Sequence, residues 1–184
     1  MTAVELEQPP AELDDFEAVV RLHWSAVSRF IMASLRDQEA AESLTQDCFL
    51  RAHRARDRFR GECSVRSWLM RIAINLVRDH ARNRRLQFWK RARTAAVDVD
   101  AASRWLADGG LSPEAQLAAK EQAQAVWRTV ERLSERQRTV FLLRFVEEMQ
   151  VMEIAAATGM KEGTVKAHLF RAVDAVRKEL RRRA

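Results

Sequence analysis

Apolar side chains recur at three- and four-residue steps in the first part of the chain, as one buried face of an α-helix requires. These positions are Phe16, Val19, Val20, Trp24, Val27, Phe30 and Ile31. They predict a helix from about Leu13 to Leu35. Asp37 is placed to cap a second helix running to about Arg56, and Ser64 or Ser67 to start a third. The buried face of the third helix would hold Val65, Trp68, Leu69, Ile72 and Leu76.

The residue types agree with an all-α fold. The 184 residues include only five Gly and three Pro, while Ala, Leu, Arg and Glu, which favour helices, are abundant. The 47% of apolar residues supply a core for one medium domain or two small ones. A disordered chain is therefore excluded.

The chain divides where helical periodicity is lost, from about residue 86 to 112. We expect a linker there, with one short helix around Trp105. A new helix begins with Ser112 as N-cap and Pro113 at the first helical position. Ser134, with a Gln three residues later, opens another through a capping box. The pattern predicts two small helical domains joined by a flexible linker.

Basic charge is concentrated in two zones of a chain with formal net charge +6. Residues 66–93 hold nine Lys or Arg and one acid, and residues 161–184 hold eight against three. Residues 1–20 hold six acids and no base. Two basic zones indicate two contacts with a polyanion such as DNA, the alternative being solvated helix faces.

Other chemistries have little support in the sequence. Cys48 and Cys63 lie outside any CxxC pattern and indicate reduced, buried thiols more than a redox switch. Asp79 and His80 are adjacent on a helix and point about 100° apart, so they do not suggest a metal site. No signal sequence or run of roughly 18 apolar residues occurs. We expect a cytoplasmic protein without enzymatic activity, cofactor, metal, small-molecule substrate or membrane insertion.

The C-terminal stretch has the spacing of a helix-turn-helix, with Ala155 where two helices approach and Gly159 in the turn. After the turn, an inward stripe is formed by Val165, Leu169, Val173, Val176 and Leu180. This stripe leaves Thr164, Lys166, Ala167, Phe170 and Arg171 on the outer face, where such helices meet base edges in the major groove. The alternative is a helical hairpin whose Phe170 packs against a neighbour. Val151 stands where Ser or Thr often caps the first helix, so we expect a frayed start.

Two N-terminal segments, ESLTQDCFLRAHR (42–54) and FRGECSVRSWLMRIAINLVRDHAR (59–82), resemble domain 2 of the extracytoplasmic-function sigma factors of RNA polymerase. The C-terminal segments SERQRTVFLLRF and EGTVKAHLFRAV resemble domain 4 of the same family. The resemblance covers about residues 13–85 and 112–180, in the family's order and spacing. It implies an acidic tail at 1–12, domain 2 at 13–90, a linker at 91–111 and domain 4 at 112–184.

The resemblance also implies partners and site residues. A transcription initiation factor of this kind binds core RNA polymerase through the β′ clamp helices and the β flap, and contacts double- and single-stranded promoter DNA. An anti-sigma factor would hold it inactive. The residues expected on the β′ clamp helices are Glu42, Gln46, Asp47 and Phe49, with Ser43 standing where the family often has Asp.

The two promoter elements would be bound by separate residue sets. Domain 2 would read and melt the minus-10 element with Gly61, Glu62, Ser64, Arg66, Arg71, Asn75, Arg78 and Arg82. Domain 4 would read the minus-35 element with Lys161, Thr164, Lys166, Ala167, His168, Phe170 and Arg171. Ala167 and His168 depart from the Ser and Arg that are common in the family. Trp68 could stack on DNA, but its spacing favours the core.

Two other functions compete with this interpretation. One is a helix-turn-helix transcriptional regulator with an N-terminal sensing or dimerising helical domain. The other is a helical interaction protein whose basic zones bind acidic partners. Core polymerase binding and promoter-specific transcription discriminate a sigma factor from both.

Overall fold

The computed structural model describes residues 13–91 and 113–183, with side chains placed for 13–83 and 122–182. The N-terminal half holds the helices α1 (Phe16–Leu35), α2 (Gln38–Ala55) and α3 (Val65–Arg91), with a short 3₁₀ turn, η2 (Arg56–Arg58), after α2. The C-terminal half holds α4 (Pro113–Arg132), α5 (Glu135–Phe145), α6 (Val151–Thr158) and α7 (Glu162–Arg183). No strand occurs in these ranges, so the all-α prediction is confirmed.

Two of the three predicted helix starts, at Asp37 and Ser64, are confirmed in the N-terminal half, and the first helix is capped by Asp15. Asp15 and Asp37 each accept a hydrogen bond from a backbone N–H three residues ahead, at 3.0 and 3.1 Å. Ser64 does the same for the N–H of Ser67 at 3.2 Å. These bonds satisfy N–H groups that a helix leaves without an internal partner. The first helix therefore begins after Asp15, slightly later than predicted.

Two other predictions for this half are wrong. Trp24 was expected in the core but is 38% exposed, and its ring stacks at 5.4 Å on Phe49, which is buried. The loss of helix expected from residue 86 is also wrong for 86–91, because α3 continues to Arg91. Periodicity marks a buried face rather than a helix, and Leu, Gln, Lys and Arg favour helix without one. The short helix expected near Trp105 lies outside the described residues.

In the C-terminal half, the corner between α4 and α5 is built as predicted. The Ser134 N–H donates to Gln137 Oε1 at 3.2 Å, completing the expected return bond of the capping box. Arg138 donates to the carbonyl oxygens of Val130 and Leu133, at 3.2 and 3.4 Å, near the end of α4. One guanidinium thus satisfies carbonyl groups that the end of α4 leaves without helical partners.

The helix-turn-helix is also present. Gly159 ends α6 with φ 70° and donates to the Ala155 carbonyl at 2.9 Å, a left-handed conformation suited to glycine. The frayed start expected at Val151 is wrong, because the Gln150 N–H is held by the Glu153 carboxylate at 2.7 Å. The inward stripe of α7 is confirmed at Val165 and Val176, and the stripe also buries Ala172, which the pattern omitted.

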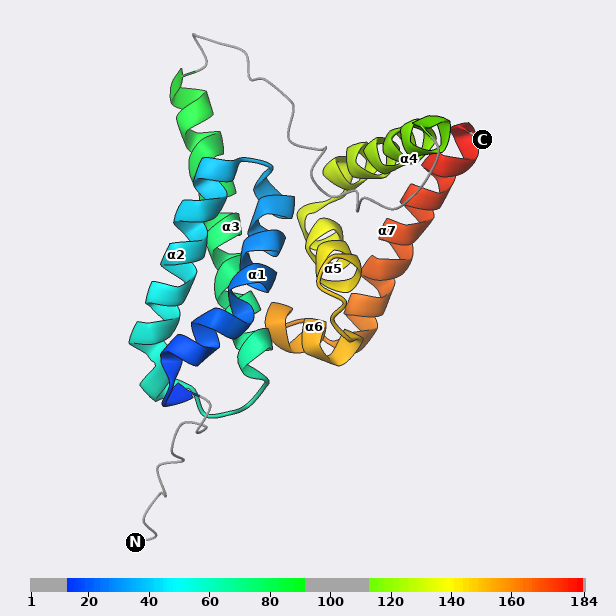
Figure 1. Cartoon of the computed structure of the whole chain (residues 1–184). Helices are drawn as coiled ribbons and strands as arrows, with labels where there is room; N and C mark the ends of the chain where they lie inside the picture. The colour runs from blue at the N-terminus through cyan, green and yellow to red at the C-terminus, as the bar shows by residue number, and fades with distance from the viewer. Residues whose placement is uncertain (1–12, 92–112, 184) are drawn as a thin grey trace, which may run out of the picture.

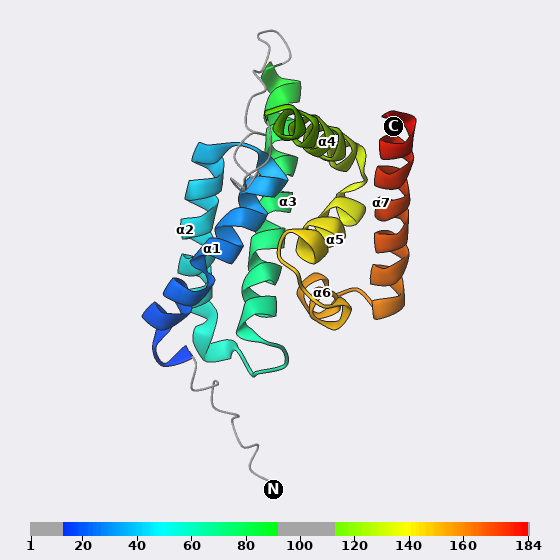
Figure 2. The ribbon, with the colours of Figure 1, turned by 45° about the vertical axis from the view of Figure 1, so that its right-hand side comes forward.

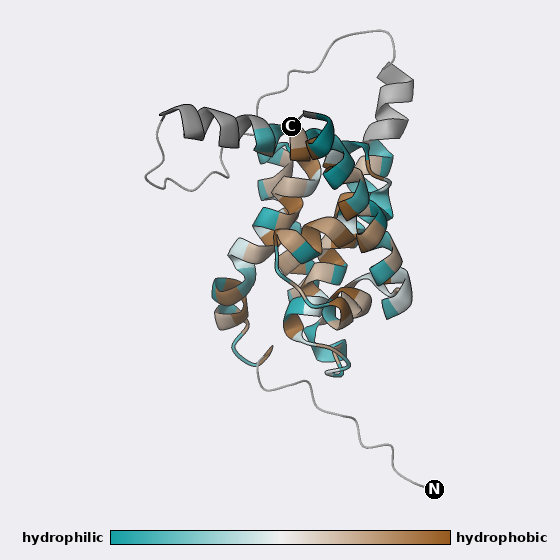
Figure 3. Ribbon diagram, turned by 90° about the vertical axis from the view of Figure 1, so that its right-hand side faces the viewer, coloured by the Kyte–Doolittle hydropathy of each residue, from teal (hydrophilic) through white to brown (hydrophobic). Residues whose placement is uncertain are grey.

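The two halves pack against each other. Figures 1 and 2 show α6 beside α3, and α5 also contacts α1. Buried apolar residues of both halves belong to one continuous cluster. Figure 3 shows hydrophobic residues gathered in the middle of this assembly and hydrophilic residues at the C-terminal end of α7. The α3–α6 contact places the helix-turn-helix against the basic helix of the N-terminal half.

Candidate nucleic-acid interface

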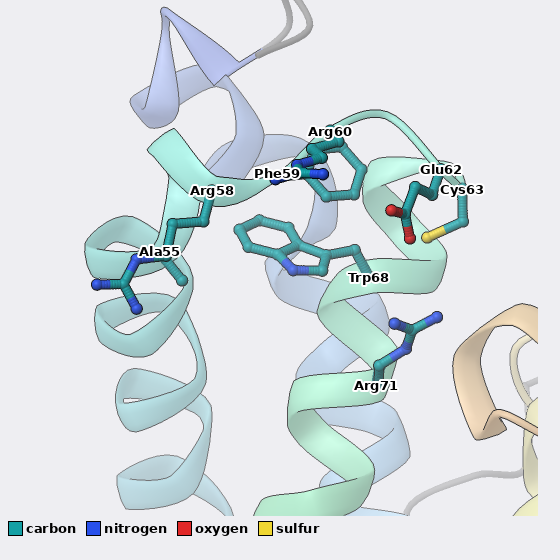
Figure 4. A pocket seen from close by; sticks show the side chains of 8 residues that line it. All are labelled: Ala55, Arg58, Phe59, Arg60, Glu62, Cys63, Trp68 and Arg71. Atoms are coloured by element: carbon teal, nitrogen blue, oxygen red, sulfur yellow. The ribbon is translucent and has the colours of Figure 1, made fainter. Parts of the chain in front are cut away.

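A small cavity lies where the loop between η2 and α3 meets both helices α2 and α3 (Figure 4). The ring of Phe59 is buried and lies 4.8 Å from the ring of Trp68. Gly61, with φ 73°, lets the chain turn over them. The cavity of about 180 Å³ is lined by Ala55, Arg58, Phe59, Arg60, Glu62, Cys63, Trp68 and Arg71. Ligand pockets commonly have roughly 300–1,000 Å³, so this one suits a single flat ring.

The chemistry of the cavity suits a nucleobase attached to a phosphate backbone. Trp68 gives it an aromatic wall, and Glu62 an acceptor for base amino groups. Arg58, Arg60 and Arg71 surround the opening with positive charge. Trp68 was predicted to be a core residue, but it is only half-buried and serves both the core and the cavity.

The remaining expected minus-10 residues lie on the loop and on α3. Gly61, Glu62, Ser64 and Asn75 are exposed, although the Ser64 hydroxyl is also used as the cap of α3. Arg82 is exposed and forms a 3.0 Å ion pair with Asp79 of the same helix. The structure brings these residues and the cavity onto one continuous stretch, from the loop along α3.

Three of the expected arginines also contact the C-terminal half, although Arg71 and Arg78 are exposed. Arg66 donates to the Glu147 carbonyl oxygen, and its Nη2 lies 3.6 Å from the carboxylate. Arg71 donates to the Ala156 carbonyl oxygen through Nε and Nη2, at 3.2 and 2.6 Å. Arg78 Nε donates to Glu135 Oε1 at 2.8 Å. These contacts account for much of the polar part of the interface between the halves.

Glu147 is the buried centre of this interface, with a side chain that is 0% exposed. Arg29 of α1 donates to both carboxylate oxygens, at 3.2 and 3.0 Å. Burial raises the pKa of the Glu147 carboxyl, while hydrogen bonds and charge from Arg29 and Arg66 oppose that rise. The contact between Arg29 and Glu147 was not predicted from the sequence, because the two residues are 118 positions apart and neither lies in a motif.

Arg58 and Arg60 were also missed as cavity residues. Both directly precede the loop at 61–64, so two basic residues beside a candidate base-binding loop were a signal that could have identified them.

The outer face of α7 carries the expected minus-35 residues. Phe170 is 74% exposed, so it does not pack into a helical hairpin. The other exposed members of this set are Lys161, Thr164, Lys166, Ala167 and Arg171, while His168 is half-buried. Beside Phe170, a second cavity of about 290 Å³ lies between α5 and α7, and Phe145 lines it. The side chains on this face offer cations and apolar surface together, as major-groove contacts require.

The expected polymerase-binding residues lie on α2. Glu42, Gln46 and Asp47 are exposed, whereas Phe49 is 5% exposed beneath Trp24. Leu50, next to Phe49, is 54% exposed. This polar and acidic face, with apolar residues at one end, suits a protein partner more than DNA.

The cysteines differ in their surroundings. Burial raises the pKa of the Cys48 thiol to about 12, partly opposed by the charge of Arg51, and Cys48 Sγ donates to the Leu69 carbonyl at 3.6 Å. Cys63 is half-buried at the cavity. Across residues 13–91 and 113–183 there is no cluster of three His, Cys, Asp or Glu side chains that could hold a metal ion. The described helices also include none long and apolar enough to cross a bilayer.

Comparison with known proteins places both halves in one family. Residues 16–87 match the model "Sigma-70 region 2", and residues 123–176 match "Sigma-70, region 4". The ECF RNA polymerase sigma-E factor of Escherichia coli is 33% identical over 156 residues, which are 83% of this chain and 77% of that protein. The chain belongs to the ECF sigma factors of RNA polymerase. It is therefore a promoter-directing sigma factor, and a helix-turn-helix regulator with a sensing domain is disfavoured.

Further similar proteins support the assignment of this ECF sigma factor to its family and fold. The ECF RNA polymerase sigma factor SigW of Bacillus subtilis is 29% identical over 91% of this chain and 90% of its own length. Among solved structures, RpoE of Bartonella quintana, in complex with the anti-sigma factor NepR, has a TM-score of 0.71 at 22% identity, covering 91% of this chain and 98% of that one. CnrH, in complex with the cytosolic domain of CnrY, has a TM-score of 0.64 at 22% identity and covers 92% and 89%. These two structures support the fold.

Proposed function

We propose that this ECF sigma factor opens the minus-10 element by holding one unstacked nontemplate base in the Trp68 cavity. The observation that carries the proposal is the juxtaposition of an aromatic-walled, base-sized cavity with a helix of arginines. A site that binds only an extruded base stabilises melted over paired DNA. Stacking contributes about 1–3 kcal/mol per base, so one captured base favours opening about five- to 150-fold.

The α3 arginines would hold the phosphates of the same strand. Arg66, Arg71, Arg78 and Arg82 are spread along α3, and Asn75 lies on the turn between Arg71 and Arg78. Phosphate contacts fix the position of a strand, while the loop and Asn75 contribute the contacts to bases. Residues 13–90 would thus work as the minus-10 domain, residues 91–111 as the linker, and residues 112–184 as the minus-35 domain.

The outer face of α7 would enter the major groove of the minus-35 element. Arg171 can bond a guanine through two hydrogen bonds, and Phe170 and Ala167 can contact thymine methyl groups. Thr164 and Lys166 complete the reading face, while Lys161 and His168 would lie near phosphates. The exposure of Phe170 supports this role, because contact with DNA would remove this large apolar side chain from water, which is favourable.

Protein partners would use other surfaces. The exposed Glu42, Gln46 and Asp47 of α2 would bind the β′ clamp helices of core polymerase, with Phe49 and Trp24 supporting that face from below. The minus-35 domain would also contact the β flap. An anti-sigma factor is a further proposed partner, since the structural relatives RpoE and CnrH occur in complexes with NepR and CnrY. The protein would act in the cytoplasm and catalyse no reaction.

The minus-10 proposal is tested by scanning the nontemplate strand with abasic sites in a holoenzyme binding assay. One position should lose about five- to 150-fold in affinity, as expected for a captured base. Ala55→Leu, which narrows the cavity from α2, should abolish that positional effect, while Ala81→Leu on the exposed face of α3 should keep it. A scan with equal losses at every position would contradict base capture.

The minus-35 proposal is tested separately with duplex DNA. Arg171→Ala should relax specificity at one base pair by about 1–3 kcal/mol. Lys178→Ala is a matched control on the same helix, because Lys178 is paired with Asp174 at 2.8 Å and lies outside the proposed reading set. Equal effects of the two variants would contradict the assignment.

A further inference from the structure

A further group of basic side chains lies at the C-terminal end of α2, across the Trp68 cavity from α3. Residues 51–60 hold five Arg and one acid, Asp57. Arg56 is paired with that acid at 3.6 Å and also contacts His53. The other four arginines are exposed, and none of them forms a hydrogen bond or an ion pair with the described part of the chain. We call this set the α2-end arginines; it consists of Arg51, Arg54, Arg58 and Arg60.

The stability of α2 explains only one of these charges. A cation in the last turn of a helix is favoured by the helix dipole, and Arg54 lies in the last turn of α2. Arg51 precedes that turn, whereas Arg58 and Arg60 lie beyond the end of the helix. Like charges three and four residues apart along helical turns destabilise the fold slightly. An anionic partner would remove this repulsion and supply acceptors for the guanidinium groups.

The cavity has arginines on both of its sides. Figure 4 shows Arg58 beside Ala55 on the α2 side and Arg71 on the α3 side, with the ring of Trp68 between them. A DNA strand whose base enters this cavity continues away from it in two directions. The proposed function assigns one direction to α3, and the other direction leads past the end of α2.

We propose that the α2-end arginines hold phosphates of the nontemplate strand on the side of the captured base opposite α3. This inference rests on the proposed capture of a base in the Trp68 cavity. From Arg51 to Arg58 the chain rises roughly 10 Å, at about 1.5 Å per residue in α2 and about 2 Å in η2. Because stacked nucleotides of one strand rise about 3.4 Å each, this length spans about three nucleotides. Asp47 is exposed one turn before Arg51 and would repel a strand that extended further.

Phosphate contacts on both sides of the captured nucleotide would hold it in place without reading the neighbouring bases. The α2-end arginines would thus add affinity for melted DNA that does not depend on sequence. An acidic segment of a protein partner offers guanidinium groups similar acceptors, since carboxylates and phosphates both accept charged hydrogen bonds. DNA is favoured over such a segment because these arginines border the cavity itself.

The test uses purified holoenzyme and a nontemplate strand selected from random sequences by binding to that holoenzyme. Uncharged methylphosphonate linkages replace single phosphates on either side of the position that the abasic scan identifies. With the unaltered protein, neutral linkages on both sides should each lower the affinity by about two- to five-fold. A loss confined to one side would overturn the proposal.

Single variants assign the two sides. Arg54→Ala should abolish the effect of at least one neutral linkage on one side of the base, and Arg82→Ala of at least one on the other side. Arg54→Lys should keep the effect, because a compact positive charge also binds phosphate. Arg21→Ala is the matched control, since Arg21 is exposed on α1 and is paired with Glu17 at 2.7 Å; its profile should equal that of the unaltered protein. Equal profiles for Arg54→Ala and Arg21→Ala would refute the contact.

Failure of this inference can be told apart from failure of base capture. If no position is sensitive to an abasic site, base capture is wrong and the inference falls with it. If one position is sensitive but Arg54→Ala only weakens binding to core polymerase and leaves the linkage profile unchanged, base capture stands. The α2-end arginines would then contact a protein and not the strand.

Discussion

The two glycines of the helix-turn-helix should respond to alanine in opposite directions. Gly159 has φ 70° and ends α6, whereas Gly163 lies in the first turn of α7 with no positive φ. A Cβ at either site meets no atom within 4 Å. Steric clashes therefore contribute nothing, and only backbone conformation distinguishes the two substitutions.

The magnitudes follow from that difference. At Gly159, an alanine in the left-handed conformation costs about 1–2 kcal/mol of folding free energy. The lower conformational entropy of the unfolded alanine chain offsets about 0.4–1 kcal/mol of that cost. Gly159→Ala should thus destabilise the fold by about 1 kcal/mol. At Gly163 only the gain applies, so Gly163→Ala should stabilise by up to about 0.5–1 kcal/mol.

Urea unfolding followed by circular dichroism measures both changes. The slope of free energy against urea concentration should stay constant, because neither substitution changes the surface exposed on unfolding. If both variants shift stability in the same direction, backbone conformation at Gly159 is not what determines its response.

Three further predictions concern charge and chemical reactivity. Arg82→Ala should reduce the salt dependence of single-strand binding by a slope of about 0.7, as expected for one lost phosphate contact; titrations at several salt concentrations measure it, and an unchanged slope contradicts a phosphate role. Burial raises the pKa of both thiols, to about 12 for Cys48, but only Cys48 is fully buried. Cys63 should therefore react with a thiol reagent at pH 8 in the folded protein much faster than Cys48, which should react only after unfolding. In Cys63→Ser only Cys48 remains, and its rapid labelling would refute burial. Burial raises the pKa of Glu147 in the folded protein, so protonation of this carboxyl stabilises the fold. The stabilisation is complete below about pH 4.3, the ordinary pKa of a Glu, and is lost as the pH rises through the pKa of the folded state. On acidification, the free energy of unfolding of the unaltered chain should therefore rise relative to that of Glu147→Gln, as measured by urea unfolding at several pH values. A fall relative to Glu147→Gln would show that the pKa of Glu147 is not raised in the folded protein.

Features governed by neighbouring residues were predictable from the sequence. Caps at Asp37 and Ser134 and the turn at Gly159 depend on side chains within a few positions of one another. The exposure of Phe170 followed from its place outside the apolar stripe of α7. In each case the physical cause lies inside one helix or one turn.

Features that depend on how the halves meet were not predictable in this way. Glu147 has no local pattern that distinguishes it from an exposed acid, yet it is buried because Arg29 comes from a helix 118 positions earlier. Arg71 and Arg78 could be assigned to a basic face of α3, but nothing nearby shows that α6 and α5 supply their acceptors. The residues expected to contact DNA stay a prediction from the sequence, and their contacts with the other half of the chain could not be predicted from it.

The length of α3 has a mechanical consequence. Its 27 residues, at 1.5 Å each, make a rod of about 40 Å that has the loop proposed to bind a base at one end and Arg91 at the other (Figure 1). A small tilt of that rod, when the loop closes on a base, would swing its distant end through a proportionally larger arc. The spacing tolerated between two promoter elements would then depend on helix orientation as well as on linker length.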